Sequence, residues 1–342
     1  MELALKLAEK GKYSVSPNPM VGAVLLKEDR LVGYGYHLFK GDAHAETKAI
    51  DMAGEKAKGA KLYLNLEPCF HSGLTPPCVD KVISAGIAEV HFSSIDPNPL
   101  VNGKSLKKLK DNNIKVFCGQ LKEAAEHLNE IFYHYMENKT PFVIAKWAMT
   151  MDGRMATAND SQWITGEDSR LHVHALRNSV DAILIGSKTA LLDNPSLNVR
   201  RNDFIKIRQP LKFILGKNLN LLPKDLNLFK IDPDKTHLID TSNNFNLNDL
   251  LIKMGGLGIT SLLVEGGSYT LSKFLQADLI NKFYCYVAPK FIAGDASLAP
   301  FSQDIGINFM KDAKESKFTN IELMGEDILI QGRFRGKKCL QE

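Results

Sequence analysis

Residues 67–78 read EPCFHSGLTPPC, a stretch in which two cysteines lie nine positions apart and each follows a proline. Thiolates and imidazoles are the ligands that zinc prefers. Upstream, residues 41–46 read GDAHAE and supply an imidazole at His44. Cys78 also precedes a predicted helix, where the backbone dipole favours a thiolate. We therefore predict that His44, Cys69 and Cys78 bind zinc.

Glu46 adds a proton carrier to this set. Structural zinc sites are closed by four protein ligands, whereas catalytic sites keep one position for water. Three strong ligands are evident here, which favours an open, catalytic site. Residues two apart on a regular helix do not face each other, so His44 and Glu46 must lie at a helix start to reach one metal. Zinc lowers the pKa of bound water to about 7, and Glu46 is the predicted catalytic residue beside it.

Other interpretations of these residues stay open. A single His or Cys is more often part of a core or surface than a ligand, although the combined order of motifs is hard to obtain by chance. A closed structural zinc module, with His71 as fourth ligand, is a second alternative. The signature of zinc nucleobase deaminases joins His-x-Glu to Pro-Cys-x-x-Cys, but here eight residues separate the cysteines. Cys118, Cys285 and Cys339 are expected to be core or surface residues without a role in metal binding.

Charge and composition limit the functions that the 342-residue chain can have. Up to Pro141 there are 18 basic and 17 acidic residues, and after it 25 and 22. Neither half is basic enough to favour nonspecific nucleic-acid binding. Five cysteines are too few for a disulfide framework. No apolar run approaches the ~20 residues of a membrane span, and no signal-peptide pattern is visible. A cytoplasmic protein is expected.

Strands and helices alternate along the chain, which predicts an α/β architecture. The polar segment before Pro141 predicts a boundary between a domain over residues 1–141 and a second over 142–342. In the first domain, residues 21–36 predict a β-hairpin, and residues 121–137 predict one long helix.

The second half carries weaker signals of its own. Residues 264–268, VEGGS, follow an apolar strand and open a helix. Such a turn lets backbone N–H groups approach a phosphate, but a tight turn without ligand is the commoner interpretation. Paired hydrogen bonds from arginine also hold phosphate. The candidates are Arg170, Arg177, Arg200 and Arg201, which on the alternative interpretation lie on a solvated face.

Several motifs together resemble one family, the bifunctional riboflavin-biosynthesis deaminase–reductases. The deaminase half of the resemblance rests on residues 16–24 (SPNPMVGAV), 35–37 (GYH), 41–46, 67–78 and 96–99 (DPNP). The reductase half rests on residues 146–154 (KWAMTMDGR), 161–165 (SQWIT), 185–200 and 264–267. The resemblance implies a cytidine-deaminase-like three-layer α/β/α domain followed by a dihydrofolate-reductase-like α/β domain with a mixed sheet.

The resemblance also implies the chemistry. The first domain would deaminate a diaminopyrimidinone ribosylamine phosphate with zinc, and the second would reduce the ribose to a ribityl chain with NADPH. It implies substrate contacts at Asn18, His71, Lys146, Ser161, Arg177, Leu197, Arg200 and Glu265. It implies NADPH contacts at Met149, Trp163, Thr189, Asp193, Gly266, Gly267 and Ser268. The implied partners are the small phosphorylated pyrimidine and a second copy of the reductase domain, with no nucleic acid or membrane.

The chain departs from the family pattern at a few positions. Leu74 stands where a basic residue often holds the substrate phosphate, so that Lys40 or Lys104 is a candidate replacement. Met151 and Asn194 replace a usual Leu and Asp. Ala293 stands where a late glycine pair is expected, which leaves the conformation of that loop open.

Two other functions remain possible on the sequence. A nucleic-acid base deaminase with an accessory nucleotide-binding domain would need a basic groove. A non-enzymatic, zinc-stapled nucleotide-sensing module would need four protein ligands on zinc.

Overall fold

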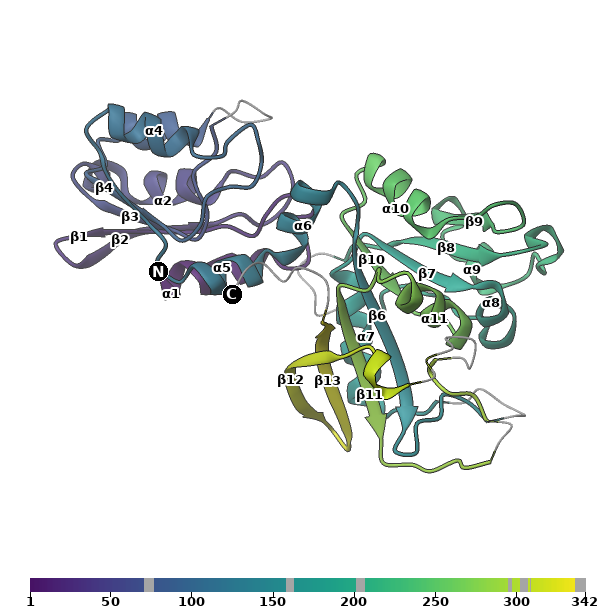
Figure 1. Cartoon of the computed structure of the whole chain (residues 1–342). Helices are drawn as coiled ribbons and strands as arrows, with labels where there is room; N and C mark the ends of the chain where they lie inside the picture. Colours follow the sequence, from purple (N-terminus) through teal and green to yellow (C-terminus); the bar gives the residue numbers. More distant parts are fainter. Residues whose placement is uncertain are drawn as a thin grey trace. The chain divides into compact units, whose positions relative to one another are not determined.

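The chain forms two units, Met1–Lys139 and Thr140–Glu342, shown in sequence colours in Figure 1. The computed structural model describes residues 1–70, 77–157, 163–200, 207–294, 297–301, 307 and 309–335. Among these residues no helix is long and apolar enough to cross a membrane.

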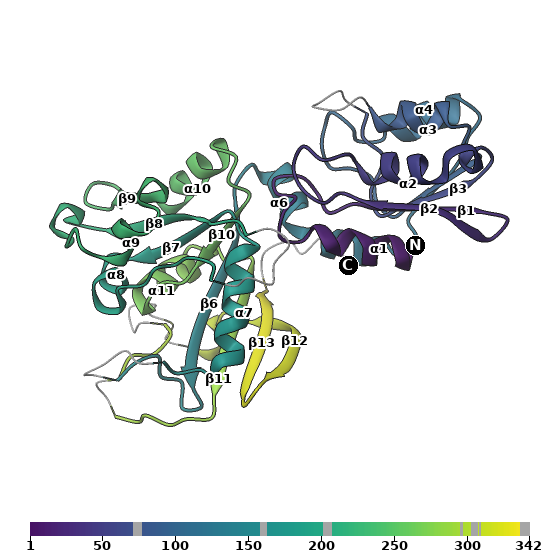
Figure 2. The same ribbon diagram turned by 180° about the vertical axis from the view of Figure 1, so that it is seen from behind.

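The first unit is built on a five-stranded sheet in the order β2-β1-β3-β4-β5. Its strands are β1 (Gly22–Lys27), β2 (Arg30–Tyr36), β3 (Lys61–Leu64), β4 (Glu89–Phe92) and β5 (Lys115–Cys118). Its helices are α1 (Glu2–Ala8), α2 (Ala45–Ala53), α3 (Cys78–Ser84), α4 (Lys104–Asp111), α5 (Lys122–Leu128) and α6 (Glu130–Asn138). Helices α2, α3 and α4 cover one face, and α1 lies on the other (Figures 1 and 2). The predicted three-layer α/β/α architecture is confirmed.

The predicted hairpin is β1 and β2, which pair antiparallel. Its turn residues Glu28 and Asp29 have φ angles of 49° and 57°, the left-handed values that a two-residue turn requires. On β2, a Cβ added to Gly33 or Gly35 would lie 2.2 or 2.3 Å from a carbonyl oxygen of α2. Glycine is therefore needed for α2 to pack directly on β2.

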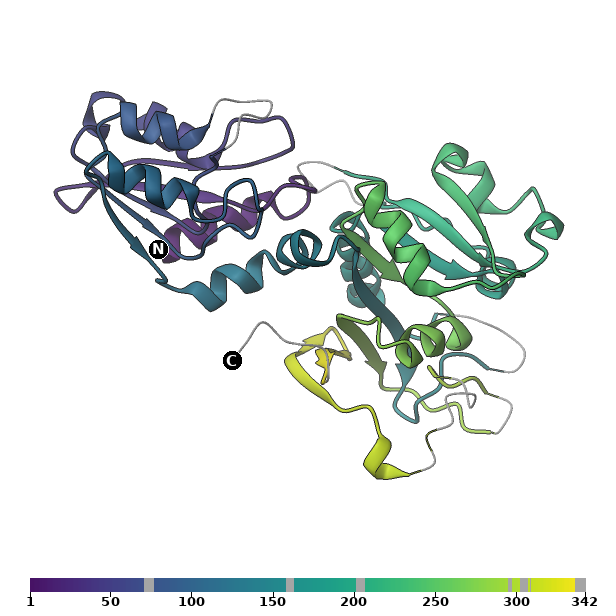
Figure 3. The ribbon, with the colours of Figure 1, turned by 45° about the horizontal axis from the view of Figure 1, so that its top comes forward.

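The prediction of one long helix over residues 121–137 is wrong. Asn129 separates α5 from α6, with φ −103° and ψ 24°, and the two short helices follow one another in Figure 3. The Asn129 side chain accepts from the Met20 backbone N–H at 2.8 Å and donates to the Met20 carbonyl at 2.9 Å. These two tertiary hydrogen bonds hold Asn129 out of the helical conformation, although the apolar pattern continues across it.

The second unit is built on an eight-stranded sheet in the order β12-β13-β11-β6-β10-β7-β8-β9. Its strands are β6 (Phe142–Thr150), β7 (Ala182–Gly186), β8 (Leu211–Gly216), β9 (Thr236–Asp240), β10 (Ser261–Val264), β11 (Lys282–Ala288), β12 (Ser316–Met324) and β13 (Asp327–Phe334). The six strands from β11 to β9 are parallel, and β13 runs antiparallel to β11 and β12. The expected mixed sheet is confirmed.

Helices cover both faces of this sheet. They are α7 (Glu167–Asn178), α8 (Ser187–Asp193), α9 (Asn227–Lys230), α10 (Leu247–Gly256) and α11 (Ser268–Gln276). Helix α7 lies on one face, and α10 and α11 lie on the other (Figures 1 and 2). Leu271 and Phe274 of α11 are fully buried against Leu262 and Val264 of β10. This core fixes the start of α11 at the end of β10.

Candidate active sites

The functional residues of the first unit meet at one edge of its sheet. Because β1 runs antiparallel to β2 and β3, its first residue Gly22 is level with Tyr36 at the end of β2. Ala23 is level with Leu64, the last residue of β3. The carboxyl ends of β2 and β3 therefore open onto the same edge. Binding sites in α/β folds commonly lie at this edge.

Four side chains converge there. His44, Glu46, Cys69 and Cys78 each offer one donor atom, and these atoms all lie within 4.8 Å of one another. His44 is the N-cap of α2 and Cys78 is the first residue of α3. The His44 Nδ1 lies 3.0 Å from Cys78 Sγ and 3.5 Å from Cys69 Sγ. One imidazole and two thiols at these separations fit the donor set of zinc.

Hydrogen bonds and burial shift the pKa values of Cys69 and Glu46. Hydrogen bonds from Cys78 and His44 to the Cys69 sulfur outweigh its burial and lower the pKa of the Cys69 thiol to about 4. One of them is the Cys78 backbone N–H, 3.2 Å from Cys69 Sγ. Glu46 is 3% exposed, and burial, with the Cys69 charge, raises the pKa of its carboxyl. A carboxyl tuned upward exchanges protons more readily near neutral pH.

Asn18 lies at the same edge. Its Nδ2 is 3.1 Å from His37 Nε2, and the buried His37 ring stands edge-on to the His44 ring with centroids 5.4 Å apart. His37 was not singled out from the sequence, although its GYH motif was. His71 and Leu74 lie outside the described residues. Lys104 donates to the Pro99 carbonyl at 3.1 Å.

In the second unit, a buried carboxylate gathers two cations. Val264 pairs with Ala145 in parallel register, so Glu265 and Lys146 lie side by side, with Lys146 Nζ 3.9 Å from Glu265 Oε2. Arg177 of α7 donates twice to Glu265, at 2.7 and 2.9 Å. The guanidinium considered for phosphate binding is thus occupied by a carboxylate.

The charges of this group depend on one another. Burial alone would raise the pKa of Glu265, but the Arg177 guanidinium outweighs burial and holds that pKa below its usual range. Burial lowers the pKa of Lys146, while the charges of Glu265 and Asp193 raise it in part. Glu265 is therefore ionised at neutral pH and keeps the two cations together.

Two helices begin next to each other on this unit. β7 and β10 are adjacent and parallel, and they lead into α8 and α11. The Gly267 N–H donates to Thr189 Oγ1 at 3.1 Å. A Cβ on Gly186 or Gly266 would come within 2.8 or 2.6 Å of Thr270. The glycines allow this close approach, and the positive ends of the two helix dipoles favour an anion there, which fits the phosphates of NADPH.

The other predicted reductase residues are spread around this edge. Asp193 ends α8, and Ser268 begins α11. Leu197 is 3% exposed and has a φ of 50°, a strained conformation of the sort that clusters at functional sites. The Arg200 N–H donates to His174 Nδ1 at 3.3 Å, and its side chain is exposed.

Met149 and Trp163 complete the predicted cofactor set. Met149 lies on β6, partly buried against the main core. Trp163 is 72% exposed, and the Arg170 guanidinium lies 5.2 Å from its ring centroid. Ser161 and Arg201 lie outside the described residues.

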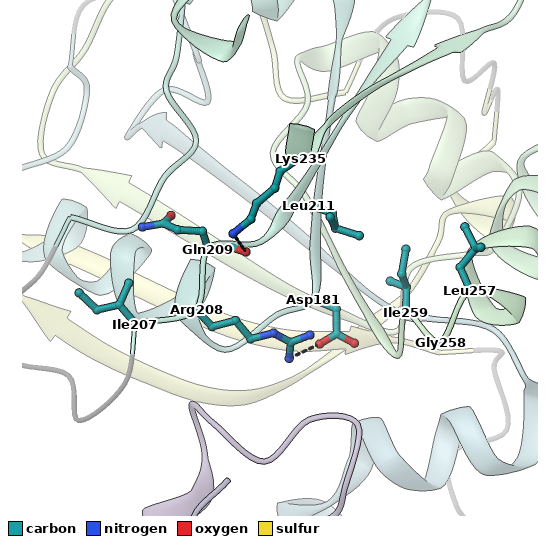
Figure 4. Close-up of a pocket in the computed structure, with 9 residues that line it drawn as sticks. All are labelled: Asp181, Ile207, Arg208, Gln209, Leu211, Lys235, Leu257, Gly258 and Ile259. Atoms are coloured by element: carbon teal, nitrogen blue, oxygen red, sulfur yellow. Dashed lines mark hydrogen bonds and ion pairs between the residues drawn. The ribbon is translucent and has the colours of Figure 1, made fainter. Parts of the chain in front are cut away.

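A separate cavity of about 460 Å³ lies at the amino ends of β7, β8 and β10. Its lining includes Asp181 and Arg208, which point toward one another in Figure 4 with 2.7 Å between Oδ1 and Nη1. Asp181 also accepts from the N–H and hydroxyl of Thr260. Because Glu265 follows the carboxyl end of β10, this cavity is at the opposite edge of the sheet from the group around Glu265.

Comparison with known proteins identifies both halves of the chain. Residues 1–94 match the family model "Cytidine and deoxycytidylate deaminase zinc-binding region", and residues 141–330 match "RibD C-terminal domain". The chain is 39% identical over 350 residues to riboflavin biosynthesis protein RibD of Aquifex aeolicus (strain VF5), with 96% of each chain covered. It is 36% identical over 361 residues to RibD of Escherichia coli (strain K12), covering 96% of this chain and 97% of the relative.

Solved structures agree over the full length. RibD of Acinetobacter baumannii, form 1, superposes with a TM-score of 0.91 at 34% identity, covering 97% of each chain. A diaminohydroxyphosphoribosylaminopyrimidine deaminase/5-amino-6-(5-phosphoribosylamino)uracil reductase from Thermotoga maritima superposes with a TM-score of 0.87 at 34% identity, covering 98% of this chain and 97% of the other. With both domains, their order and the zinc-site residues in place, the chain belongs to the RibD family of riboflavin biosynthesis proteins.

Proposed function

We propose that this chain carries out both RibD steps with the residues described above, deamination in the first unit and reduction in the second. The substrate is a diaminopyrimidinone ribosylamine phosphate, which loses a ring amine as ammonia and whose ribose is then reduced to a ribityl chain. The observation that carries the proposal is the convergence of His44, Glu46, Cys69 and Cys78 within 4.8 Å, in a chain whose second half matches the RibD reductase domain.

In the first unit, each residue has a distinct task. His44, Cys69 and Cys78 would hold zinc, which would supply an activated water at neutral pH. Glu46 accepts a proton from the attacking water and delivers it to the departing ammonia. Its burial keeps bulk water from competing for that proton. The Asn18 amide, oriented by His37, binds the pyrimidine.

In the second unit, NADPH would supply the hydride for the reduction at C1′ of the ribose. The protein supplies orientation and charge. Arg177 holds Glu265 in place with two hydrogen bonds. Glu265 in turn holds the Lys146 ammonium, which donates a hydrogen bond to the sugar. The starts of α8 and α11 would hold the cofactor phosphates.

The Glu46→Gln variant tests the deaminase step. The amide keeps the shape of the side chain but cannot carry the proton, so ammonia release is expected to fall about a thousandfold. Zinc content and NADPH oxidation with pre-deaminated substrate should stay unchanged in the same protein. Ammonia release at the wild-type rate would exclude the mechanism.

Product masses test the whole assignment. Purified protein is incubated with the diaminopyrimidinone phosphate, with and without NADPH. Without NADPH the substrate should be replaced by its deaminated product alone. With NADPH the product should gain two further hydrogens. If the full chain does not oxidise NADPH with the deaminated substrate, the reductase assignment is wrong.

We also propose a homo-oligomer formed through the second unit and a cytoplasmic location. In support of the first, edge strand β12 exposes Phe318, Ile321 and Leu323 by 57%, 58% and 75%, and exposed apolar edge strands favour association. In support of the second, Cys118 and Cys285, the two described cysteines outside the zinc set, form no disulfide, as in reducing compartments. Light scattering and cell fractionation test the two proposals.

A further inference from the structure

Glu67 is a buried carboxylate to which the mechanism above assigns no task. It lies two residues before Cys69 and is 3% exposed. Its two oxygens accept four backbone N–H groups. Oε2 accepts from Asp96 at 3.3 Å and Gly103 at 2.9 Å, and Oε1 accepts from Ser105 at 3.0 Å and Leu106 at 3.2 Å. A carboxylate that accepts several backbone N–H groups is a strong and directional anchor.

The four donors flank one loop, residues 96–103, which is the later part of the connection from β4 to α4. Asp96 begins the loop, and Gly103 is the N-cap of α4. Ser105 and Leu106 belong to the first turn of α4, where backbone N–H groups have no helical partner and a negative charge is favourable. Glu67 therefore clamps both ends of the loop to the segment that follows β3.

The loop is held together by hydrogen bonds of its own. The Asn98 N–H donates to Asp96 Oδ1 at 2.8 Å, and the Leu100 N–H donates to Asn98 Oδ1 at 3.1 Å. The Glu67 N–H also donates to the Ser94 carbonyl at 2.9 Å. The segment that carries Cys69 is thus tied to the exit of β4 through both main chain and side chain.

The loop leaves the sheet beside the segment that carries Cys69, because β3 and β4 are parallel and Leu64 is level with Phe92. Asp96 is 6% exposed, and burial, with the charges of Glu67 and Cys69, raises the pKa of its carboxyl to about 7. A change at Glu67 would therefore alter both the segment that carries Cys69 and the loop.

We propose that Glu67 is a positioning residue of the deaminase site, whose carboxylate sets the spacing between the Cys69 segment and loop 96–103. This inference rests on the proposed deaminase function. It assigns Glu67 two effects: it holds the Cys69 thiolate in the geometry that retains zinc, and it holds the loop beside that segment, at the sheet edge where the pyrimidine is proposed to bind.

Glu67→Gln in the full-length chain tests the inference. A glutamine offers one acceptor oxygen and turns its NH₂ toward backbone donors, so the clamp opens at one end. We expect KM for the diaminopyrimidinone phosphate to rise about tenfold, with kcat reduced less than KM is raised. Zinc transfer to a chromogenic chelator should become about tenfold faster, since residues that orient metal ligands typically change affinity by 10–100-fold.

Controls separate positioning from general stability. Reductase activity with pre-deaminated substrate should be unchanged and normalises protein concentration. Glu89→Gln alters a carboxylate in the same unit that pairs with Lys61 and Lys115 at the surface, and it should leave KM and zinc transfer unchanged. Glu67→Asp keeps the charge on a side chain one methylene shorter. It should raise KM and speed zinc transfer as Glu67→Gln does, but by smaller factors. If Glu67→Gln does not fold, the measurements on Glu67→Asp decide the test.

The outcomes are distinct. A lower melting temperature with unchanged KM and unchanged zinc transfer would make Glu67 a helix cap only and overturn the inference. If the wild-type chain releases no ammonia, the proposed function fails. Zinc transfer from the Glu67 variants still decides between positioning and capping in that case, because it does not depend on turnover.

Discussion

Glu265 is the residue on which the charges of the second unit depend. Its replacement by glutamine would leave the buried Arg177 guanidinium without a counter-charge. We expect the free energy of unfolding of this unit to fall by about 3 kcal/mol, with loss of reductase activity. Both tryptophans of the chain, Trp147 and Trp163, lie in this unit, so urea unfolding followed by tryptophan fluorescence measures it selectively. A variant as stable as wild type would contradict the ion-pair network.

The pH dependence of stability follows from the same carboxylate. The folded-state pKa of Glu265 is lowered from 4.5, so the unfolded state binds its proton more tightly. Its stabilising contribution is complete above about pH 4.5 and is lost as the pH falls toward the folded-state pKa. Urea midpoints measured between pH 7 and 3 should drop below pH 4.5 in wild type. The drop should be smaller in Glu265→Gln.

Ala293 lies in a loop whose conformation the sequence did not determine, because a glycine pair was expected there. Its φ is 56°, and its N–H donates to Asp152 Oδ2 at 2.7 Å. The chain thus keeps a glycine-like conformation with an alanine. Ala293→Gly should stabilise the second unit by about 1 kcal/mol, or about 3 °C in melting temperature. Ala293→Val should destabilise it, because a β-branched residue tolerates this region poorly. If Ala293→Val were more stable than Ala293→Gly, the backbone at Ala293 would not be strained.

At the scale of elements, the glycines of β2 decide where the metal ligands lie. Gly35 faces the Ala45 carbonyl oxygen in the first turn of α2, next to His44 and Glu46. A methyl group there would push the start of α2 away from the sheet, and overpacking of this kind typically costs 1–3 kcal/mol.

Gly35→Ala is therefore expected to reduce the zinc content of purified protein and to abolish most deaminase activity. Gly54→Ala provides the contrast, because a Cβ at Gly54 meets no atom within 4 Å, although its φ of 55° adds some strain. Metal analysis and melting curves compare the two variants. Full zinc occupancy in Gly35→Ala would show that α2 can shift without moving His44.

How much the sequence predicts depends on the range of the interactions. The hairpin and the grouping of His44, Cys69 and Cys78 were predictable because residue type and short-range order encode them. The break at Asn129 was not, since its side chain bonds to Met20, which is 109 positions away. Apolar periodicity carries no signal for such a contact.

The same limit applies to the polar networks. Arg177 and Glu265 are 88 positions apart, so the sequence could name both residues without revealing that they bind each other. The donors to Glu67 lie 29 to 39 positions away. They are backbone groups, which have no residue signature, and the clamp was therefore invisible before the fold was known.

For the whole molecule, the division into two units predicts that the two activities can be separated. Removal of zinc by a chelator should abolish ammonia release, whereas NADPH oxidation with deaminated substrate should continue at the wild-type rate. Readdition of zinc should restore ammonia release. A parallel loss of both activities would mean that the second unit depends on the metal site of the first.

The location of both sites at strand ends has a consequence for how such a chain can diverge. The side chains proposed for binding and chemistry sit largely on helix starts and on the segments that follow β3, β7 and β10, while the strand interiors mostly supply the cores. Insertions or exchanges in those segments leave the hydrogen-bonding ladder intact. New substrate preferences can therefore arise by exchange of those segments while the strands stay unchanged.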